Sequence, residues 1–453
     1  MFARVCFGLL SLTAVRLSAQ VVPDASGGSP SPDDEYQMSM PTQVSGRSYP
    51  MEVGPEQRTN DLSLGLIFTV AYDDNLYAGG VSTPVSATSF ALFPTIGFHR
   101  STPREDTSIN YGVGFTYYHP NPTNSLNNAN QNLNSAFAFR LTKHSSLSIQ
   151  DTFQQNSTQF NQPYPLNGTA VSGSTIGPST PLIVPYENQI FNSTRMEYGY
   201  QFSRNAMFGG AGTYGIARYP DLTSSANLTT STGLNNSDSA GGLGFYTRRL
   251  SKTQFLGVIY QYSHTTTNPV DSTTNTQAGS LFYTVAPSSR FTLSVTAGPQ
   301  YFTSQVVGFP KTNSIGSFVL ASFDVHGPRS SVAASYSHSV TAGQGLLGAF
   351  TSDGFNVSAR RQLSRLWSAG ISGSYYDLTN ATSVTVINPA TRGGHGLFGT
   401  VMVSRQLGEH LTAEADYRRL HQTYGGIPVI SNSPDDDRVS VSINYQYRRP
   451  IGR

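Results

Sequence analysis

The sequence predicts an all-β protein: a single antiparallel up-and-down β-barrel of about 18 strands that crosses a membrane. Three observations carry this prediction. Segments of roughly ten residues alternate between apolar and small or polar side chains, which is the period of a β-strand. These segments come in pairs joined by very short turns. Longer loops rich in Asn, Ser, Thr, Gly and Pro join one pair to the next, and transmembrane barrels show this asymmetry of short periplasmic turns and long extracellular loops.

The composition fits a barrel wall. Charged residues make up 12% of the 453 residues, against roughly 25% in a typical soluble domain. The chain has no run of roughly 18 apolar residues, which a membrane helix would need. Only alternate residues of a barrel strand face lipid, so a barrel is neither strongly apolar nor strongly charged. The net charge is +2 without a basic cluster, so nucleic-acid binding is not expected.

The chain divides into a leader, a linker and the barrel. Residues 1–19 have the organisation of a secretory signal peptide ending at Ala19, with a buried N-terminal helix as the alternative. Residues 20–60 are rich in Pro, Ser, Gly and Asp, which predicts a flexible periplasmic segment; it could instead enter the barrel or contact a periplasmic partner. The barrel spans residues 61–453. Because Cys6 is the only cysteine and lies in the leader, the mature chain should have no thiol chemistry.

The strands follow one another in pairs. The last is the clearest, because Val439, Val441 and Ile443 alternate with serines. The predicted strands are 61–72, 88–99, 106–118, 131–141, 146–156, 189–202, 206–218, 238–250, 253–264, 275–286, 290–303, 313–325, 330–341, 352–363, 366–378, 395–406, 410–421 and 437–449. An even number places both ends of the barrel in the periplasm. Pro94 and Pro299 each remove a ladder donor, so we expect a bulge at Pro94 and the same difficulty at Pro299.

The strand lengths and aromatic residues suit a bilayer. A strand rises ~3.3 Å per residue, so ten residues tilted by about 40° span the roughly 25 Å of an outer-membrane apolar band. Closure is required because an open edge would leave backbone groups unpaired in lipid. Tyrosines near strand ends, such as Tyr72, Tyr117, Tyr198 and Tyr445, predict two interfacial girdles. Aromatic filling of a soluble β core is the alternative.

A sparse set of charges alternates with the apolar residues. By strand parity, the inward-pointing residues are Arg140, Arg195, Glu197, Arg248, Arg360, Glu414, Asp416, Arg418, Arg438 and Arg448. An Arg or Lys facing lipid at mid-depth would cost about 2–4 kcal/mol, so these residues should line a water-filled, weakly cationic lumen. They either pair and stiffen the wall or set a field that selects solutes. Asp151 falls on the apolar parity, which suggests a bulge or an interfacial position.

The longest predicted loop runs from residue 157 to 188 and is the third long loop. It resembles, in position and length, the third extracellular loop of general porins, which folds inward and narrows the channel. The resemblance implies that Tyr164, Tyr186 and Glu187 lie at a constriction. A surface loop that only caps the mouth is the alternative.

Motifs for catalysis are missing from the sequence. It has no His-x-x-x-His pair, and no Gly-x-Ser-x-Gly elbow or phosphate-binding glycine loop in a suitable context. The acids Asp73–Asp74 and Asp435–Asp437 could bind Ca²⁺, but adjacent loop acids are more often solvated. We therefore expect no enzymatic activity, no cofactor and no metal.

From Asp61 onward the chain resembles uncharacterised bacterial outer-membrane β-barrels of a porin-like or exopolysaccharide-associated kind. The run Ala71-Tyr72-Asp73-Asp74-Asn75-Leu76-Tyr77 is similar to the "tyrosine, aspartate, asparagine, apolar" signature that opens several such families. The resemblance implies a Gram-negative outer membrane, contact with its lipid and lipopolysaccharide, and insertion by the barrel assembly machinery. The chain departs from the pattern at its end, where Arg448–Arg453 follows the last aromatic residue in place of a terminal Phe.

The expected function is passive: a porin-like channel for small polar solutes or for polysaccharide. The alternative is a non-conducting structural or adhesive surface barrel that acts through its extracellular loops. A barrel enzyme acting on lipid or peptide is a third hypothesis, and it would need a Ser/His/Asp-type cluster at one membrane level.

Overall fold

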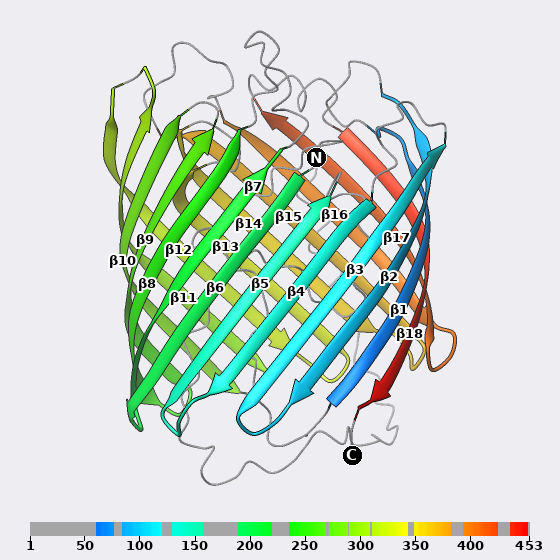
Figure 1. Ribbon diagram of the computed structural model, residues 1–453, viewed down its shortest axis with the longest axis horizontal. Helices are drawn as coiled ribbons and strands as arrows, with labels where there is room; N and C mark the ends of the chain where they lie inside the picture. The colour runs from blue at the N-terminus through cyan, green and yellow to red at the C-terminus, as the bar shows by residue number, and fades with distance from the viewer. Residues whose placement is uncertain are drawn as a thin grey trace, which may run out of the picture.

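The residues that the structure describes form one closed antiparallel sheet of 18 strands (Figure 1). The computed structural model describes residues 60–76, 84–119, 129–156, 189–219, 235–268, 271–288, 290–308, 310–342, 348–381, 393–424 and 435–451. The strands are β1 (Asn60–Asp73), β2 (Ala87–Ser101), β3 (Glu105–His119), β4 (Ala129–Arg140), β5 (Ser145–Asn156), β6 (Gln189–Ser203), β7 (Ala206–Arg218), β8 (Asn236–Ser251), β9 (Gln254–Asn268), β10 (Ser272–Ser288), β11 (Phe291–Val306), β12 (Thr312–His326), β13 (Ser330–Ala342), β14 (Ala349–Gln362), β15 (Trp367–Asn380), β16 (Gly394–Gln406), β17 (Leu411–Tyr424) and β18 (Asp435–Pro450). The prediction of an 18-stranded barrel is confirmed, and each predicted strand lies within a few residues of an observed one.

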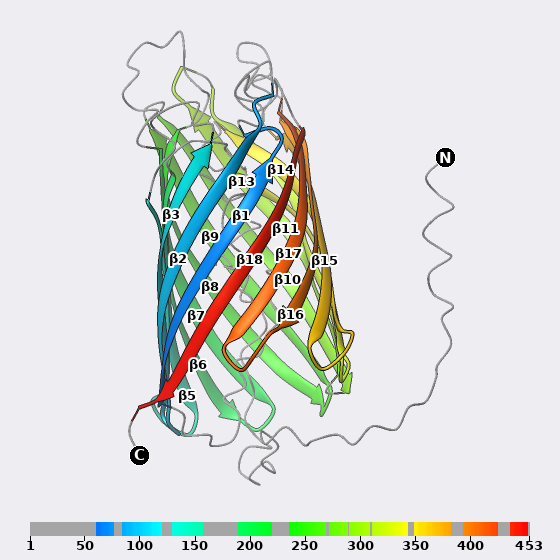
Figure 2. The same cartoon turned by 90° about the vertical axis from the view of Figure 1, so that its right-hand side faces the viewer.

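Closure is made by the first and last strands. β1 pairs with β18 in one unbroken register from Asp61↔Pro450 to Asp73↔Arg438. Figure 2 shows these two strands side by side at the front of the barrel. The described residues contain no helix long and apolar enough to cross a membrane. The predicted leader and the linker up to residue 59 lie outside the described residues.

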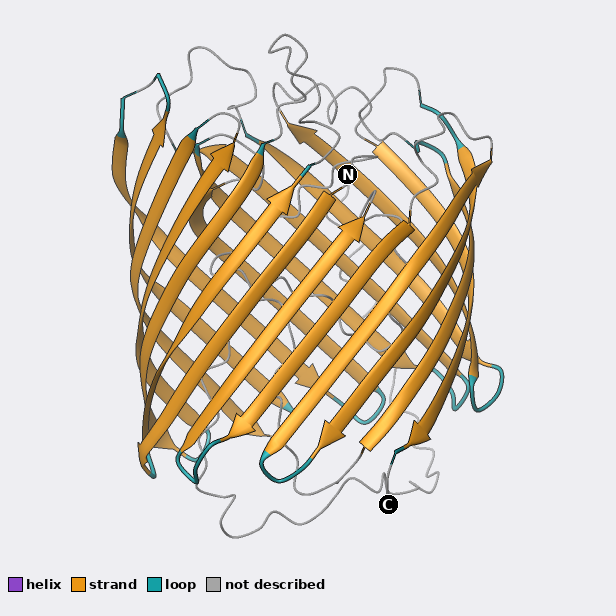
Figure 3. Cartoon of the chain, in the orientation of Figure 1, coloured by secondary structure: helices purple, strands orange, loops and turns teal. Residues whose placement is uncertain are grey.

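The two ends of the barrel differ. The short turns lie at the end where β1 begins and β18 finishes, which we call the turn end, and the other end is the loop end (Figure 3). Hydroxyl side chains organise the turns. Thr142 Oγ1 accepts the backbone N–H groups of His144 and Ser145 at 3.1 and 3.0 Å. Ser364 Oγ accepts two backbone N–H groups in the same way. This bonding explains why Ser or Thr recurs at the same place in these turns.

The outer surface of the barrel is apolar. On β1, Leu64, Leu66 and Phe68 are each more than 40% exposed, whereas the alternate residues Thr69 and Ala71 are buried. Exposed aromatic residues gather toward both ends of the strands. Toward the loop end they include Tyr72, Tyr117, Tyr214, Tyr301 and Tyr375, and toward the turn end Tyr198, Tyr246, Tyr283, Trp367, Tyr445 and Tyr447. The barrel is therefore inverted relative to a soluble protein, with apolar side chains outside and small or polar side chains inside.

The two prolines within strands do not cause bulges, so that expectation is wrong. Pairing of β2 with β3 lapses between Leu92↔Phe115 and Thr95↔Gly112 and resumes in the same register. β10 and β11 behave identically around Pro299. A proline lacks only one N–H, so the ladder on its other side is kept, and Pro94 remains opposite Leu66 of β1.

Candidate functional site: the barrel lumen

A network of charged side chains lines one wall of the lumen, from β14 to β1. On β18, Val439 and Val441 are more than half exposed on the outer face, so Arg438 and Ser440 point inward. On β17 the inner face carries Glu414, Asp416 and Arg418, all buried. The alternation of each strand places these charges on the inner face, away from the apolar outer surface.

The contacts within this wall are short. Arg418 Nε donates to Asp416 Oδ1 at 2.7 Å, and the Ser440 hydroxyl donates to the other Asp416 oxygen. Arg360 and Arg418 both act electrostatically on Glu414. Arg418 and Arg438 are cross-strand neighbours of like charge, which Asp416 and Asp73 offset. Charges that pair within the wall make it more rigid.

Arg195 and Glu197 form a second pair on β6. Arg195 donates from Nε at 3.0 Å and from Nη2 at 2.5 Å to the same oxygen, Glu197 Oε2. Both side chains are largely shielded, with 4% and 12% of their surfaces exposed. They share the inner face with Ser193, which is buried, while Met196 and Tyr198 face outward.

Two of the remaining sequence-assigned arginines lie at the turn end. Arg140 is the last residue of β4, and Arg448 is near the end of β18. Arg448 is 65% exposed, with Nε 3.6 Å from Asp61 of β1. These residues therefore border the mouth of the barrel and stand apart from the charged wall.

The prediction that Arg248 lines the lumen is wrong. Arg248 shares a face of β8 with Tyr246 and Leu250, which are 40% and 53% exposed on the outer surface. Phe245 instead points inward and packs with Met207, Leu243, Phe255 and Ile259 in an apolar cluster on the inner wall. Because large apolar residues occupy the inner face here, parity based on apolarity assigned this strand the wrong way round.

The inner face also carries acids that the sequence analysis did not place in the lumen. By the same parity they are Asp61, Asp73, Asp106, Asp324 and Asp436. With Arg248 outside and these acids inside, arginines no longer outnumber carboxylates among the described inner-face residues. The expectation of a cationic lumen is therefore not supported. Strand parity, extended to the ends of each strand, would have placed these acids on the inner face from the sequence.

Asp151 lies on the outer face without a bulge. Its register is continuous with Ser135 of β4 and Thr194 of β6. The carboxylate oxygen Oδ1 accepts a hydrogen bond from the Thr194 hydroxyl at 2.6 Å and one from Asn192 Nδ2 at 3.2 Å. Donors on the neighbouring strand thus satisfy the Asp151 carboxylate, which explains how an acid can lie on the apolar outer face.

The predicted constriction residues Tyr164, Tyr186 and Glu187 lie outside the described residues. The described part of the chain contains a different inward feature, the loop-end half of β13. β12 pairs with β13 only from Val319↔His338 to His326↔Ser331. Beyond that point β13 leaves β12 and contacts β11 and β10.

Gln300 holds this inturned segment in place. Its side chain, on the inner face of β11, donates from Nε2 to Val340 O at 2.8 Å and accepts from Val340 N at 2.7 Å. The Val340 side chain lies over Gly316 on the inner face of β12 and packs with Phe302 and Ala349. The loop-end part of β13, around Val340, therefore lies against the inner faces of β11 and β12. Strand parity continued from Tyr336 would place Val340 on the outer face, and no local signal predicts the Gln300 contact.

Fold and lumen together define a closed barrel with an apolar exterior and a polar, charge-paired interior. No protein-family model matches the chain, and no curated protein matches it. Among solved structures, it is similar to Pseudomonas aeruginosa OccK3 (OpdO), with 11% identity and a TM-score of 0.41, over 86% of this chain and 96% of that one. It is also similar to P. aeruginosa OccK2 (OpdF) in complex with glucuronate, with 10% identity and a TM-score of 0.43, over 86% and 98% of the two chains. Acinetobacter baumannii OccAB4 matches with 8% identity and a TM-score of 0.41, over 87% and 100%. These likenesses are ones of general barrel architecture.

Proposed function

We propose that the protein is a porin-like channel of a bacterial outer membrane that passes small polar solutes passively. The observation that carries the proposal is the inversion of polarity across the barrel wall. The outer surface exposes large apolar side chains such as Leu64, Phe68 and Val441. Contact with water would be unfavourable for such a surface, whereas contact with lipid would stabilise it. The short-turn end then faces the periplasm and the loop end faces outward.

The size and lining of the barrel support a channel. Barrels of 16 to 18 strands enclose a lumen too wide for their own side chains to fill, so water occupies it. The paired charges of β6 and β17 would offer a solute alternative hydrogen bonds at little cost, as polar channel walls do. The loop-end part of β13, turned inward at Val340, would reduce the width of the lumen near the loop end, which would favour small solutes over polysaccharide.

Single-channel recording tests the proposal. The full-length mature barrel, refolded in detergent and added to planar bilayers, should give a steady open current. Because acids balance the inner-face arginines, the reversal potential in a salt gradient should show only weak ion selectivity. Folded protein that gives no current would remove the channel and favour the non-conducting structural or adhesive barrel. Polysaccharide passage, lipopolysaccharide contact and insertion by the assembly machinery remain predictions from the sequence.

A further inference from the structure

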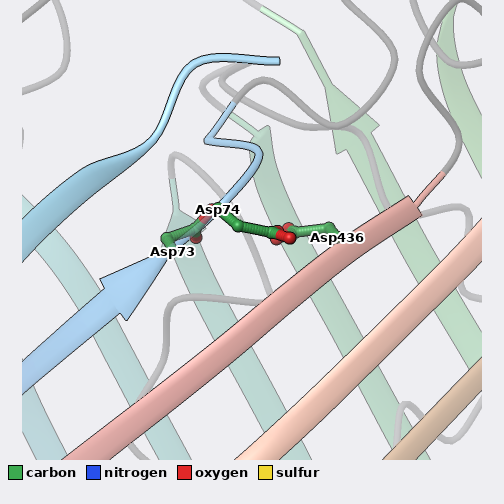
Figure 4. A group of neighbouring side chains, drawn as sticks. All are labelled: Asp73, Asp74 and Asp436. Atoms are coloured by element: carbon green, nitrogen blue, oxygen red, sulfur yellow. The ribbon is translucent and has the colours of Figure 1, made fainter.

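The line where β1 meets β18, which we call the seam, carries a cluster of acids at its loop end. Asp73 ends β1, Asp74 follows it, and Asp436 is the second residue of β18. One carboxylate oxygen from each lies within 4.8 Å of the others. Figure 4 shows Asp74 and Asp436 pointing toward each other, with Asp73 beside them.

Burial makes this cluster unusual. Asp73 and Asp436 are only 2% and 3% exposed. Asp436 Oδ1 is fully covered, no donor group in the described part of the chain reaches it, and its nearest acidic neighbour is the carboxyl of Asp73, with which the Asp436 carboxyl is within hydrogen-bonding reach. A buried carboxylate oxygen without a donor is costly, and such atoms in native structures commonly mark an ion or water. This observation is separate from the proximity of the three acids and points to a ligand at the same place.

The charges near the seam leave a deficit that fits a divalent ion. Arg438 is the cross-strand neighbour of Asp73 and acts electrostatically on both Asp73 and Asp436. It offsets one of the three carboxylate charges when all are ionised. Two negative charges then remain uncompensated by this neighbour, which equals the charge that a divalent cation would supply.

Backbone groups fix the carboxylates in position. The N–H of Asp437 donates to Asp74 Oδ1 at 2.7 Å, and the N–H of Asn75 donates to Asp73 Oδ1 at 3.2 Å. The N–H of Asp74 in turn donates to the carbonyl of Asp437 at 3.1 Å, so the residue after β1 is tied to β18. The backbone therefore fixes the carboxylates of Asp73 and Asp74, and it ties Asp74 to β18 beside Asp436, before any ion binds.

We infer that Asp73, Asp74 and Asp436 bind a hard divalent cation, with Ca²⁺ preferred, which clips the loop end of β1 to β18. Carboxylate oxygens are the ligands that Ca²⁺ prefers, and its flexible coordination suits three monodentate acids completed by water. Transition metals favour imidazole or thiolate, which this cluster does not offer. Bound Ca²⁺ would stabilise closure of the barrel, because an ion that binds only the folded seam adds to its stability.

The test uses the full-length barrel refolded in detergent after treatment with a chelator. Tb³⁺, whose luminescence neighbouring tyrosines can excite, should bind and be displaced by Ca²⁺. Ca²⁺ should also raise the melting temperature by several degrees. Asp436→Asn keeps the side-chain shape and removes the charge, and it should weaken Tb³⁺ and Ca²⁺ binding at least tenfold and abolish the thermal shift.

Two further variants keep the test decisive. Asp74→Asn changes an exposed ligand and should show the same loss of binding even if Asp436→Asn folds poorly. Asp353→Asn removes a carboxylate on the outer face of β14, where Tyr336 and His338 bond it, and should bind Ca²⁺ like the unmodified protein. Equal Tb³⁺ binding in Asp74→Asn and the unmodified chain, or no Ca²⁺-dependent rise in melting temperature, would overturn the inference. Neither outcome would bear on channel conductance, which tests the proposed function separately.

Discussion

The inturned tip of β13 offers the sharpest prediction, because a single side chain holds it. In Gln300→Met the side chain keeps its length and loses its amide. Both hydrogen bonds to Val340 disappear, and the N–H and carbonyl of Val340 lose their partner on the inner face. Gln300 is 2% exposed, so water replaces these bonds only if the segment moves.

The magnitude follows from the two bonds. Each is worth roughly 1 kcal/mol net, and each buried group left without a partner costs about 1–3 kcal/mol. Together they favour the docked tip by roughly 2–4 kcal/mol. Since ~1.4 kcal/mol is a factor of ten, the variant should shift the docking equilibrium by roughly 30- to 700-fold toward an undocked tip. Single-channel conductance should rise and fluctuate more, because the widened state is more often occupied.

A disulfide provides the matched control. The Val340 side chain comes within 3.3 Å of where a Cβ on Gly316 would lie, which is close enough for paired cysteines to be bridged. The described residues contain no competing cysteine. Gly316→Cys with Val340→Cys should lock the tip inside, and adding a reductant should raise the conductance. If folded Gln300→Met conducts like the unmodified protein and the bridge also changes nothing, the tip does not narrow the channel.

Two other substitutions test the wall on its inner and outer faces. Asp416→Asn leaves Arg418 buried without its carboxylate, so we expect a loss of about 3–5 kcal/mol in the free energy of unfolding, measured by urea titration. It should also shift the reversal potential toward anion selectivity, and an unchanged potential would place this pair outside the conducting path. Thr194→Val removes a donor to Asp151 on the lipid-facing side and should cost about 1–3 kcal/mol. The loss should be smaller in an Asp151→Asn background, so equal losses in the two backgrounds would contradict the contact.

The strands could be predicted from the sequence because the side-chain period of two is local. Each alternating segment predicts the position of a strand and which of its side chains face lipid. Hydroxyl residues in the short turns indicate where the strands end. The same rule failed at β8. There Leu243 and Phe245 belong to an apolar cluster inside the barrel, and Gly242 and Gly244 leave the outer face without a side chain. The large apolar side chains of this strand therefore face the interior, and the rule that apolar residues face lipid assigned Arg248 to the wrong face.

The inward turn of β13 at Val340 could not be predicted from the sequence for a different reason. Up to Tyr336 and His338 the parity of β13 is regular, and it would continue to place Val340 on the outer face. The observed position depends on Gln300, forty residues away on another strand. Contacts of this kind need the register of strands that are not neighbours, which no local pattern encodes.

The charged groups of the lumen divide in the same way, into contacts that local strand parity predicts and contacts that depend on the alignment of strands far apart in the sequence. The pairs Arg195–Glu197 and Asp416–Arg418 each lie two residues apart on one strand, so parity alone puts both members on one face. The acids at the seam come from opposite ends of the chain, and their meeting depends on how β1 is aligned with β18. A slip of one residue would turn every side chain of one strand to the other face. Asp73 would then no longer share the inner face with Arg438 and Asp436, and the three carboxylates would not meet. The alignment that closes the barrel therefore also creates the proposed cation site, and a bound ion would in turn stabilise that alignment.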